Sequence, residues 1–184
     1  PLHWLVADGS RAFVAESTAG GMNIFDDPAG VLTNEPPFGH QMQGLANYMH
    51  LSPRQPQNAF SPGIKLEPHG MGFGAIGLPG DASPQSRFVR AAFFAGNFSG
   101  DLPEFFNVLG ALSVPRGSCI TDEGEEATIY SCCCMPCCGT YFYRTERSLC
   151  VCRVDLFAED LSSALPVAYP MHTLHAVAVN SRRE

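Results

Sequence analysis

The sequence has few charged residues, and basic ones are the scarcer kind. Its 184 residues include 11 Lys and Arg against 18 Asp and Glu, which gives a net charge of -7 at pH 7. The basic residues are spread along the chain, whereas a protein that binds a phosphate backbone needs a clustered basic surface. Nucleic acid is therefore not expected as a partner. The sequence also lacks an uninterrupted apolar stretch of roughly 18 residues, so we expect no membrane-spanning segment.

A secretory signal is missing from the visible start of the chain. The first residue is Pro1 rather than Met, and the residues after it have neither a basic start nor a long apolar segment. We expect that this beginning is cut. Seven of the eight cysteines lie between Cys132 and Cys152, whereas the disulfides of a secreted protein usually join distant segments. We therefore expect reduced thiols and a cytoplasmic protein.

The chain contains enough apolar sequence to form a folded core. Hydrophobic residues make up 45% of it and aromatic residues 10%, which is too apolar for a disordered protein. The length fits the usual size of one domain. We expect residues 1–184 to form a single domain.

Local patterns predict strands at both ends of the chain and helices between them. Ser83 before Pro84 and Asp101 before Glu104 are typical of helix starts, because their side chains can cap free backbone N–H groups. Alternating apolar residues favour strands, and an apolar stripe at helical spacing favours a helix. The predicted strands are 2–8, 12–16, 22–25, 31–33, 128–132, 141–144 and 149–154, and the predicted helices are 41–51, 84–96 and one after Asp101. Residues 53–82 are so rich in Gly and Pro that we expect a long loop. This order predicts an α+β fold.

Two motifs resemble cofactor sites. Residues 72–77 match the GxGxxG string, but the Leu-Pro-Gly that follows prevents the helix that a dinucleotide site needs. Four cysteines have a spacing that could surround a metal ion, namely Cys134, Cys137, Cys150 and Cys152. Cys150 and Cys152 fall in a predicted strand, where both side chains would share one face as small apolar groups. We predict no cofactor and keep a thiolate metal-binding module as an alternative.

Two polar side chains are candidates for a functional site. Asn34 follows the apolar run 31–33, where its amide could donate to an oxyanion, although an Asn before two prolines is also typical of a turn. Arg87 falls in the first turn of a predicted apolar helix. A cation is unfavourable at that end of the helix dipole unless an anion faces it. Arg87 therefore either has a functional role or pairs with Asp81.

Several separate segments resemble the choloylglycine hydrolase family, which includes bile salt hydrolases and penicillin V acylases. The similarity follows the family's order and covers most of the chain. The segments that carry it are Pro1-Leu2-His3-Trp4, Gly30-Val31-Leu32-Thr33-Asn34, Leu78-Pro79-Gly80-Asp81, Ser86-Arg87-Phe88-Val89-Arg90-Ala91-Ala92-Phe93, Glu104-Phe105-Phe106, Val114-Pro115-Arg116-Gly117-Ser118, Tyr130-Ser131-Cys132 and Tyr141-Phe142-Tyr143. The resemblance implies the C-terminal part of a four-layer αββα sandwich, the fold of N-terminal-nucleophile hydrolases.

The resemblance also implies a function and roles for both candidates. The family cleaves the amide that joins glycine or taurine to a bile acid, and its nucleophile is a cysteine at the mature N-terminus. Asn34 matches the asparagine that helps form the oxyanion hole, and Arg87 matches the active-site arginine. Pro1 matches the middle of the family's sequence, so we expect an incomplete domain without the nucleophile, which is inactive alone. The family further implies a homo-oligomer, a homotetramer, that acts on a conjugated bile salt.

Other functions remain open from the sequence. Penicillin V acylase is the alternative within the family. The family has only one or two cysteines near the hairpin in which this chain has the cluster at 132–138. A Cys-rich metal-binding module and a non-catalytic interaction domain are therefore alternatives of another class.

Overall fold

The three strands at the start of the chain form an antiparallel meander. The computed structural model describes residues 2–171, and the chain divides into the units Pro1–Gly100 and Asp101–Glu184. In the first unit β1 (Leu2–Ala7), β2 (Ala12–Thr18) and β3 (Gly21–Asp26) pair in the order β1-β2-β3. These strands confirm the predicted hairpin and the predicted strand 22–25. The single-domain expectation stays a prediction.

Residues 31–33 form no strand, so that prediction is wrong. The backbone there has no ladder partner. Val31 and Leu32 instead pack against the buried cluster of Val14, Phe38 and Phe88. The apolar pattern therefore reflects burial, which a short apolar run shows in either kind of structure.

Helices of the first unit pack on this cluster. Helix α1 (Phe38–Gly44) continues as the 3-10 turn η1 (Leu45–Tyr48), so the predicted helix 41–51 begins and ends three residues early. Helix α2 (Pro84–Ala95) begins as predicted, because the hydroxyl of Ser83 accepts a hydrogen bond from Ser86 N. Phe38 and Phe88 meet edge to face, with ring centroids 6.2 Å apart. The contact joins α1 to α2.

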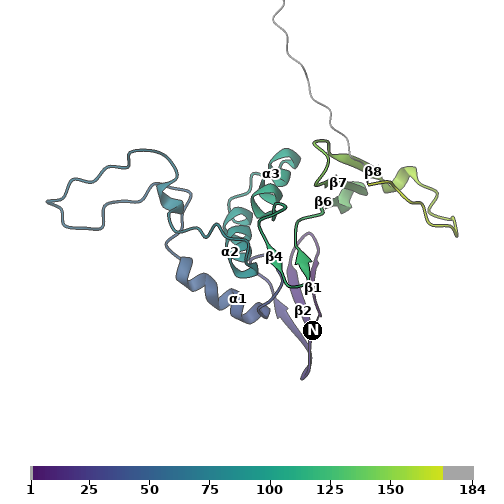
Figure 1. Cartoon of the computed structure of the whole chain (residues 1–184), viewed down its shortest axis with the longest axis horizontal. Helices are drawn as coiled ribbons and strands as arrows, with labels where there is room; N and C mark the ends of the chain where they lie inside the picture. The colour runs from purple at the N-terminus through teal and green to yellow at the C-terminus, as the bar shows by residue number, and fades with distance from the viewer. Residues whose placement is uncertain (1, 172–184) are drawn as a thin grey trace, which may run out of the picture. The chain divides into compact units, whose positions relative to one another are not determined.

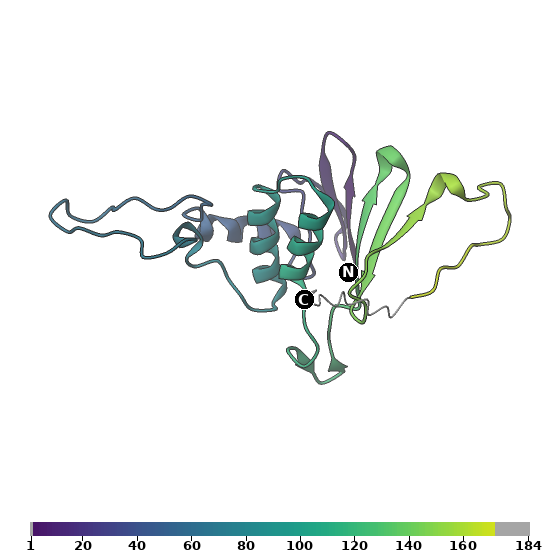
Figure 2. The same cartoon turned by 90° about the horizontal axis from the view of Figure 1, so that it is seen from above.

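A long excursion, residues 53–72, separates these two helices, and we call it the arm. Figures 1 and 2 show it extending away from the helices of its unit. Its base is closed by a hydrogen bond of 2.9 Å from Ser52 N to Gly74 O. The 3-10 turn η2 (Phe73–Ala75) follows it. The loop predicted for 53–82 is confirmed.

The second unit combines one helix with two small sheets. Helix α3 (Leu102–Leu112) begins where predicted, since Asp101 accepts a hydrogen bond of 2.7 Å from Glu104 N. The first sheet is β4 (Ile120–Thr121) with β5 (Gly124–Glu125), which the sequence did not indicate. The other is an antiparallel meander of β6 (Tyr130–Met135), β7 (Thr140–Thr145) and β8 (Cys152–Asp155), as Figure 1 shows. The 3-10 turns η3 (Pro136–Cys138) and η4 (Leu156–Ala158) complete the unit.

The predicted strand 149–154 is shorter than expected, because β8 begins only at Cys152. Cys150 therefore lies outside the ladder, and the argument that it shares a strand face with Cys152 is wrong. Among residues 2–171, every helix is too short or too polar to cross a bilayer.

Candidate active site

The loop that carries Asn34 is held in place by the buried side chain of Gln41. Gln41, on α1, has an exposed fraction of 0%. Its Nε2 donates to the backbone oxygens of Asn34 and Pro36, both over 2.6 Å. Its Oε1 accepts a hydrogen bond of 2.7 Å from the Thr33 hydroxyl. One amide thus fixes the backbone on both sides of Asn34.

The Thr33 hydroxyl also connects this loop to the helix that carries Arg87. It lies 2.9 Å from the backbone oxygen of Pro84, the first residue of α2. The loop after β3 and the start of α2 are therefore held side by side, although 51 residues separate them. Both candidate side chains are placed by this junction.

The structure brings the two predicted site residues into direct contact. Arg87 Nη2 donates a hydrogen bond of 2.6 Å to Asn34 Oδ1, and Arg87 Nε donates one of 3.1 Å to Ala82 O. A guanidinium has only donors, so its partner on Asn34 must be the carbonyl oxygen. The bond therefore fixes the amide so that Nδ2 faces away from Arg87. Within residues 2–171, Asn34 Nδ2 has no hydrogen-bond partner and remains available to a ligand.

The start of α2 is stabilised by Asp81 rather than by an acidic residue inside its first turn. The carboxylate of Asp81 accepts hydrogen bonds from Ser83 N, over 2.9 Å, and from the Ser86 hydroxyl, over 2.6 Å. These bonds hold the pKa of Asp81 well below its usual range, with the Ser83 and Ser86 contacts as the largest causes. The negative charge of the carboxylate is also stabilised by the positive end of the helix dipole, which lies at the start of α2. The turn that presents Arg87 is therefore pinned by a stable anion.

Arg90 fixes the loop that precedes α2. Its side chain is buried, with 8% exposed, and its Nη1 donates over 2.8 Å to the backbone oxygens of both Pro79 and Asp81. Arg90 is therefore a structural cation, whereas the half-buried Arg87 keeps its guanidinium at the site.

A small hollow of about 290 Å³ lies next to Asn34 and includes His3 and Glu16 in its lining. Glu16 is 5% exposed, and its Oε1 accepts a hydrogen bond of 2.7 Å from Phe38 N. The same oxygen lies 3.5 Å from His3 Nδ1. The lining of the hollow therefore includes both Asn34 and the buried carboxylate of Glu16.

Sequence reasoning missed Gln41, Glu16 and Arg90. A signal was present for Gln41, since it lies three residues after Phe38 and four before Leu45, a spacing that puts it on the same helical face as these apolar residues. A polar residue on a buried face must find hydrogen-bond partners. Nothing in the local pattern indicated Glu16, whose partner is 22 residues away.

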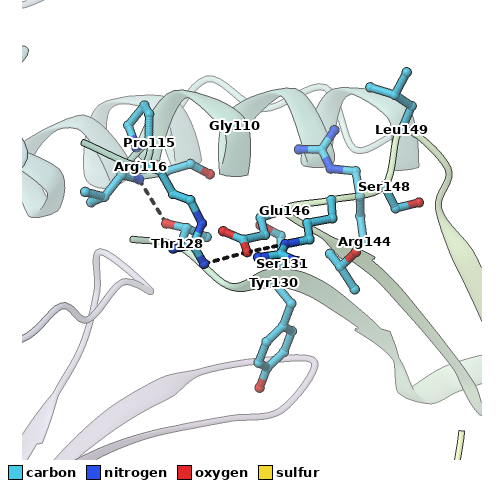
Figure 3. Close-up of a pocket in the computed structure, with 14 residues that line it drawn as sticks. Gly110, Pro115, Arg116, Thr128, Tyr130, Ser131, Arg144, Glu146, Ser148 and Leu149 are labelled. Carbon is cyan, nitrogen blue, oxygen red and sulfur yellow. Dashed lines mark hydrogen bonds and ion pairs between the residues drawn. The ribbon is translucent and has the colours of Figure 1, made fainter. Parts of the chain in front are cut away.

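A second cavity, of about 570 Å³, lies wholly within the second unit and is shown in Figure 3. Arg116 lines this cavity and forms ion pairs with Glu146, over 2.7 Å, and with Glu125, over 3.0 Å. The bonds to Arg116 lower the pKa of Glu146, and the two carboxylates raise the pKa of Arg116. Neither Asn34 nor Arg87 lines this cavity. These ion pairs connect the loop before β4 to the end of β7.

All eight cysteines are free thiols. Among the described residues, no group of three or more His, Cys, Asp or Glu side chains is placed to hold a metal ion. The four-thiolate arrangement that the cysteine spacing suggested is therefore not present in the part of the chain that the structure covers.

Comparison with known proteins relates the chain to a group of amide hydrolases. A bile salt hydrolase/transferase of Lactiplantibacillus plantarum is 44% identical over 180 residues, which cover 94% of this chain and 56% of that protein. A crystal structure of a mutant conjugated bile acid hydrolase from Clostridium perfringens matches with a TM-score of 0.85 and 34% identity, over 93% of this chain and 54% of that one. A penicillin V acylase from Agrobacterium tumefaciens matches with a TM-score of 0.64 and 22% identity, over 84% of this chain and 45% of that one. That last likeness shows the fold alone.

The chain therefore has the α+β fold of the N-terminal-nucleophile hydrolases. Its residues 1–169 match the linear amide C-N hydrolases of the choloylglycine hydrolase family. The chain belongs to the choloylglycine hydrolase family. It spans about half the length of the curated relatives that it matches.

Proposed function

We propose that this chain is part of an enzyme that hydrolyses the amide bond of glycine- or taurine-conjugated bile salts. Support comes from its family and from the 44% identity to a bile salt hydrolase/transferase. In this proposal the nucleophile is the cysteine that the family resemblance implies at the mature N-terminus of a longer polypeptide. This chain supplies Asn34 and Arg87 to the same site, without a cofactor.

The hydrogen bond between Arg87 and Asn34 is the observation that carries the proposal. When a thiolate attacks an amide carbonyl, negative charge builds on the carbonyl oxygen. Asn34 Nδ2, kept free by the bond on Oδ1, is the donor to that oxygen. A preorganised donor of this kind lowers the barrier by about 3–4 kcal/mol. Arg87 acts as the positioning residue that holds the amide in the required orientation.

Asn34→Asp in the longer polypeptide tests this role. Aspartate keeps an oxygen for Arg87 to bind, but it replaces the donor Nδ2 with a second acceptor. We expect kcat on glycocholate to fall about 100- to 1000-fold, with no loss of thermal stability. Asn47→Asp, at an exposed position on η1, is the matched control. A kcat that survives Asn34→Asp would contradict the proposed role.

We further propose that the 184-residue chain alone is inactive, because the nucleophile lies in polypeptide outside it. Incubation with glycocholate should release no more glycine than a heat-killed control. The longer polypeptide should hydrolyse glycocholate faster than penicillin V, since the relatives with the higher identities are bile salt and bile acid hydrolases. Faster cleavage of penicillin V would favour the other branch of the family.

The proposal includes a single domain in a cytoplasmic homotetramer. The free thiols support a reducing compartment. The arm supports assembly, because it presents exposed apolar side chains such as Phe60 and Met71, at 72% and 96%. Sedimentation of the longer polypeptide as a tetramer is the expected result, and a monomer at micromolar concentration would contradict it.

A further inference from the structure

The turn between β6 and β7 concentrates four of the eight cysteines. Its sequence is Cys133-Cys134-Met135-Pro136-Cys137-Cys138, two adjacent-cysteine pairs around Met-Pro, and we call residues 133–138 the thiol turn. The pair Cys133 and Cys134 belongs to the end of β6, and the pair Cys137 and Cys138 to the 3-10 turn η3. The amidase site does not use any of these thiols.

The thiols of this turn are accessible. Cys134, Cys137 and Cys138 are exposed, and Cys133 is half-buried. Their contacts are weak: Cys138 Sγ lies 3.5 Å from Met135 O, and Cys133 Sγ lies 4.0 Å from Cys134 O. Thiols are weak hydrogen-bond donors, so a ligand that bonds to these sulfur atoms breaks only weak hydrogen bonds.

The remaining cysteines have different surroundings. All four are half-buried, namely Cys119, Cys132, Cys150 and Cys152. Cys132 and burial raise the pKa of Tyr141, and burial and Cys152 raise the pKa of Tyr143, so both cysteines lie next to a tyrosine hydroxyl. The thiol turn is therefore the part of the cluster that a reagent reaches first.

The two pairs differ in geometry. Adjacent residues of a strand project to opposite faces of the sheet, so the side chains of Cys133 and Cys134 diverge. Cys137 and Cys138 lie in a 3-10 turn instead, outside the ladder. Successive side chains of a 3-10 helix lie about 120° apart around its axis, against about 180° in a strand, so those of Cys137 and Cys138 diverge less than those of Cys133 and Cys134. The 137–138 pair is the one suited to chelation.

The backbone of the turn is held in place before any ligand binds. Gly139 follows the pair with φ +58°, and a Cβ there would lie 2.5 Å from the Phe157 ring. Leu156 N also donates a hydrogen bond of 2.8 Å to Gly139 O. The segment after β8 therefore clamps the end of the turn. A site that is ordered beforehand loses less entropy when it binds.

The number of available ligands selects the chemistry. Among residues 2–171 no three metal-binding side chains converge, whereas structural zinc needs four. Thiolates favour soft partners, and trivalent arsenic forms stable rings with only two thiols. We propose that Cys137 and Cys138 are a binding site for trivalent arsenicals.

The step is a condensation without electron transfer. An arsenoxide, R–As=O, reacts with the two thiols to form two As–S bonds. Both S–H bonds and the As=O bond break, and the two protons leave with the oxygen as one water molecule. Arsenic stays trivalent and neither sulfur is oxidised, so no further reagent is needed.

Phenylarsine oxide and intact-mass measurement of the purified, reduced chain test the proposal. At one equivalent we expect one phenylarsenic adduct, which persists with excess glutathione and is removed by 2,3-dimercaptopropanol. The double variant Cys137→Ser/Cys138→Ser should lose the adduct. The matched variant Cys133→Ser/Cys134→Ser should keep it, because its pair diverges on the strand.

Circular dichroism should show that both variants keep the fold, since three of the four positions are exposed and serine is close in size. The proposal is overturned if the wild-type chain forms no adduct, or if the adduct survives Cys137→Ser/Cys138→Ser. Equal loss in both variants would also overturn it, because adjacency in sequence rather than the turn geometry would then decide binding.

Discussion

Arg87 Nη2 and Asn34 Oδ1 lie 2.6 Å apart, although 53 residues separate the two side chains in sequence. Arg87 comes from the first turn of α2, and Asn34 from the loop between β3 and α1. The bond gives the amide of Asn34 a single orientation, because a guanidinium accepts no hydrogen bond and can face only the carbonyl end. The side chain of Asn34 is thereby held in one orientation through Oδ1, and its Nδ2 takes no part in this bond.

The first prediction concerns this orientation and needs only the 184-residue chain. Arg87→Leu removes the donor, so the amide of Asn34 should rotate between its two orientations. We expect the two Nδ2 proton resonances of Asn34 in a 15N-labelled sample to move toward the values of a free amide. Arg54→Leu, at an exposed position in the arm, is the control. Unchanged Asn34 resonances in Arg87→Leu would show that the hydrogen bond does not order the amide.

The second prediction concerns Gln41, the buried amide under the Asn34 loop. Gln41→Leu leaves the backbone oxygens of Asn34 and Pro36 without their donor, and an unsatisfied buried group costs about 1–3 kcal/mol. We expect the free energy of unfolding, measured with urea, to fall by about 2 kcal/mol or more. Gln43→Leu makes the same exchange at an exposed position of the same helix. A similar loss in both variants would mean that the hydrogen bonds of Gln41 contribute little.

Some features of the fold and of the candidate site can be predicted from the sequence alone, and others cannot. Local signals were sufficient for the starts of α2 and α3, because Ser83 and Asp101 cap neighbouring N–H groups through short-range bonds. Asn34 is a candidate because it follows the apolar run 31–33, and Arg87 because a cation is unfavourable in a first helical turn. The family resemblance supports both. The family resemblance predicts that both residues belong to one site, but it does not predict their direct hydrogen bond, since that bond depends on how a loop and a helix pack.

The errors have a common physical cause. The apolar run at Val31 and Leu32 predicts a strand, but in the structure these side chains pack against the buried cluster that contains Phe38 and Phe88, without pairing to another strand. The alternation of residues 149–154 predicts that Cys150 lies in a strand, but β8 begins two residues later, at Cys152. Burial and pairing both select apolar residues, and only tertiary contacts separate the two.

The third prediction concerns the base of the arm. A Cβ at Gly74 would lie 2.0 Å from Arg54 O and 2.3 Å from Ser52 O, both rigid backbone atoms. Gly74→Ala must therefore separate the two backbone segments at the base of the arm and weaken the hydrogen bond from Ser52 N to Gly74 O. We expect faster cleavage of the arm in limited proteolysis, while the melting of the rest of the unit changes little. Gly80→Ala, where a Cβ meets nothing within 4 Å, is the control. Equal proteolysis rates in the two variants would contradict the close approach at Gly74.

The fourth prediction concerns acid stability at the start of α2. The hydrogen bonds to Ser83 and Ser86 lower the pKa of Asp81 in the folded chain. In the unfolded chain the pKa of an Asp is about 3.9. The folded state therefore binds the proton more weakly. The stability that Asp81 contributes is fully present above the unfolded pKa and is lost as the pH falls through the folded one.

Asp81→Asn tests this dependence, because asparagine keeps one acceptor oxygen but not the charge. The wild-type chain should be more stable than the variant at pH 6, and the difference should shrink as the pH falls below about 4. Urea unfolding at a series of pH values measures it, with Asp122→Asn, an exposed carboxylate of the second unit, as the reference for removing a surface charge. A difference that stays constant between pH 6 and pH 3 would mean that the loop conformation, and not the ionised carboxylate, is what holds Ser83 and Ser86. In that case the first turn of α2 would present Arg87 equally well at acid pH.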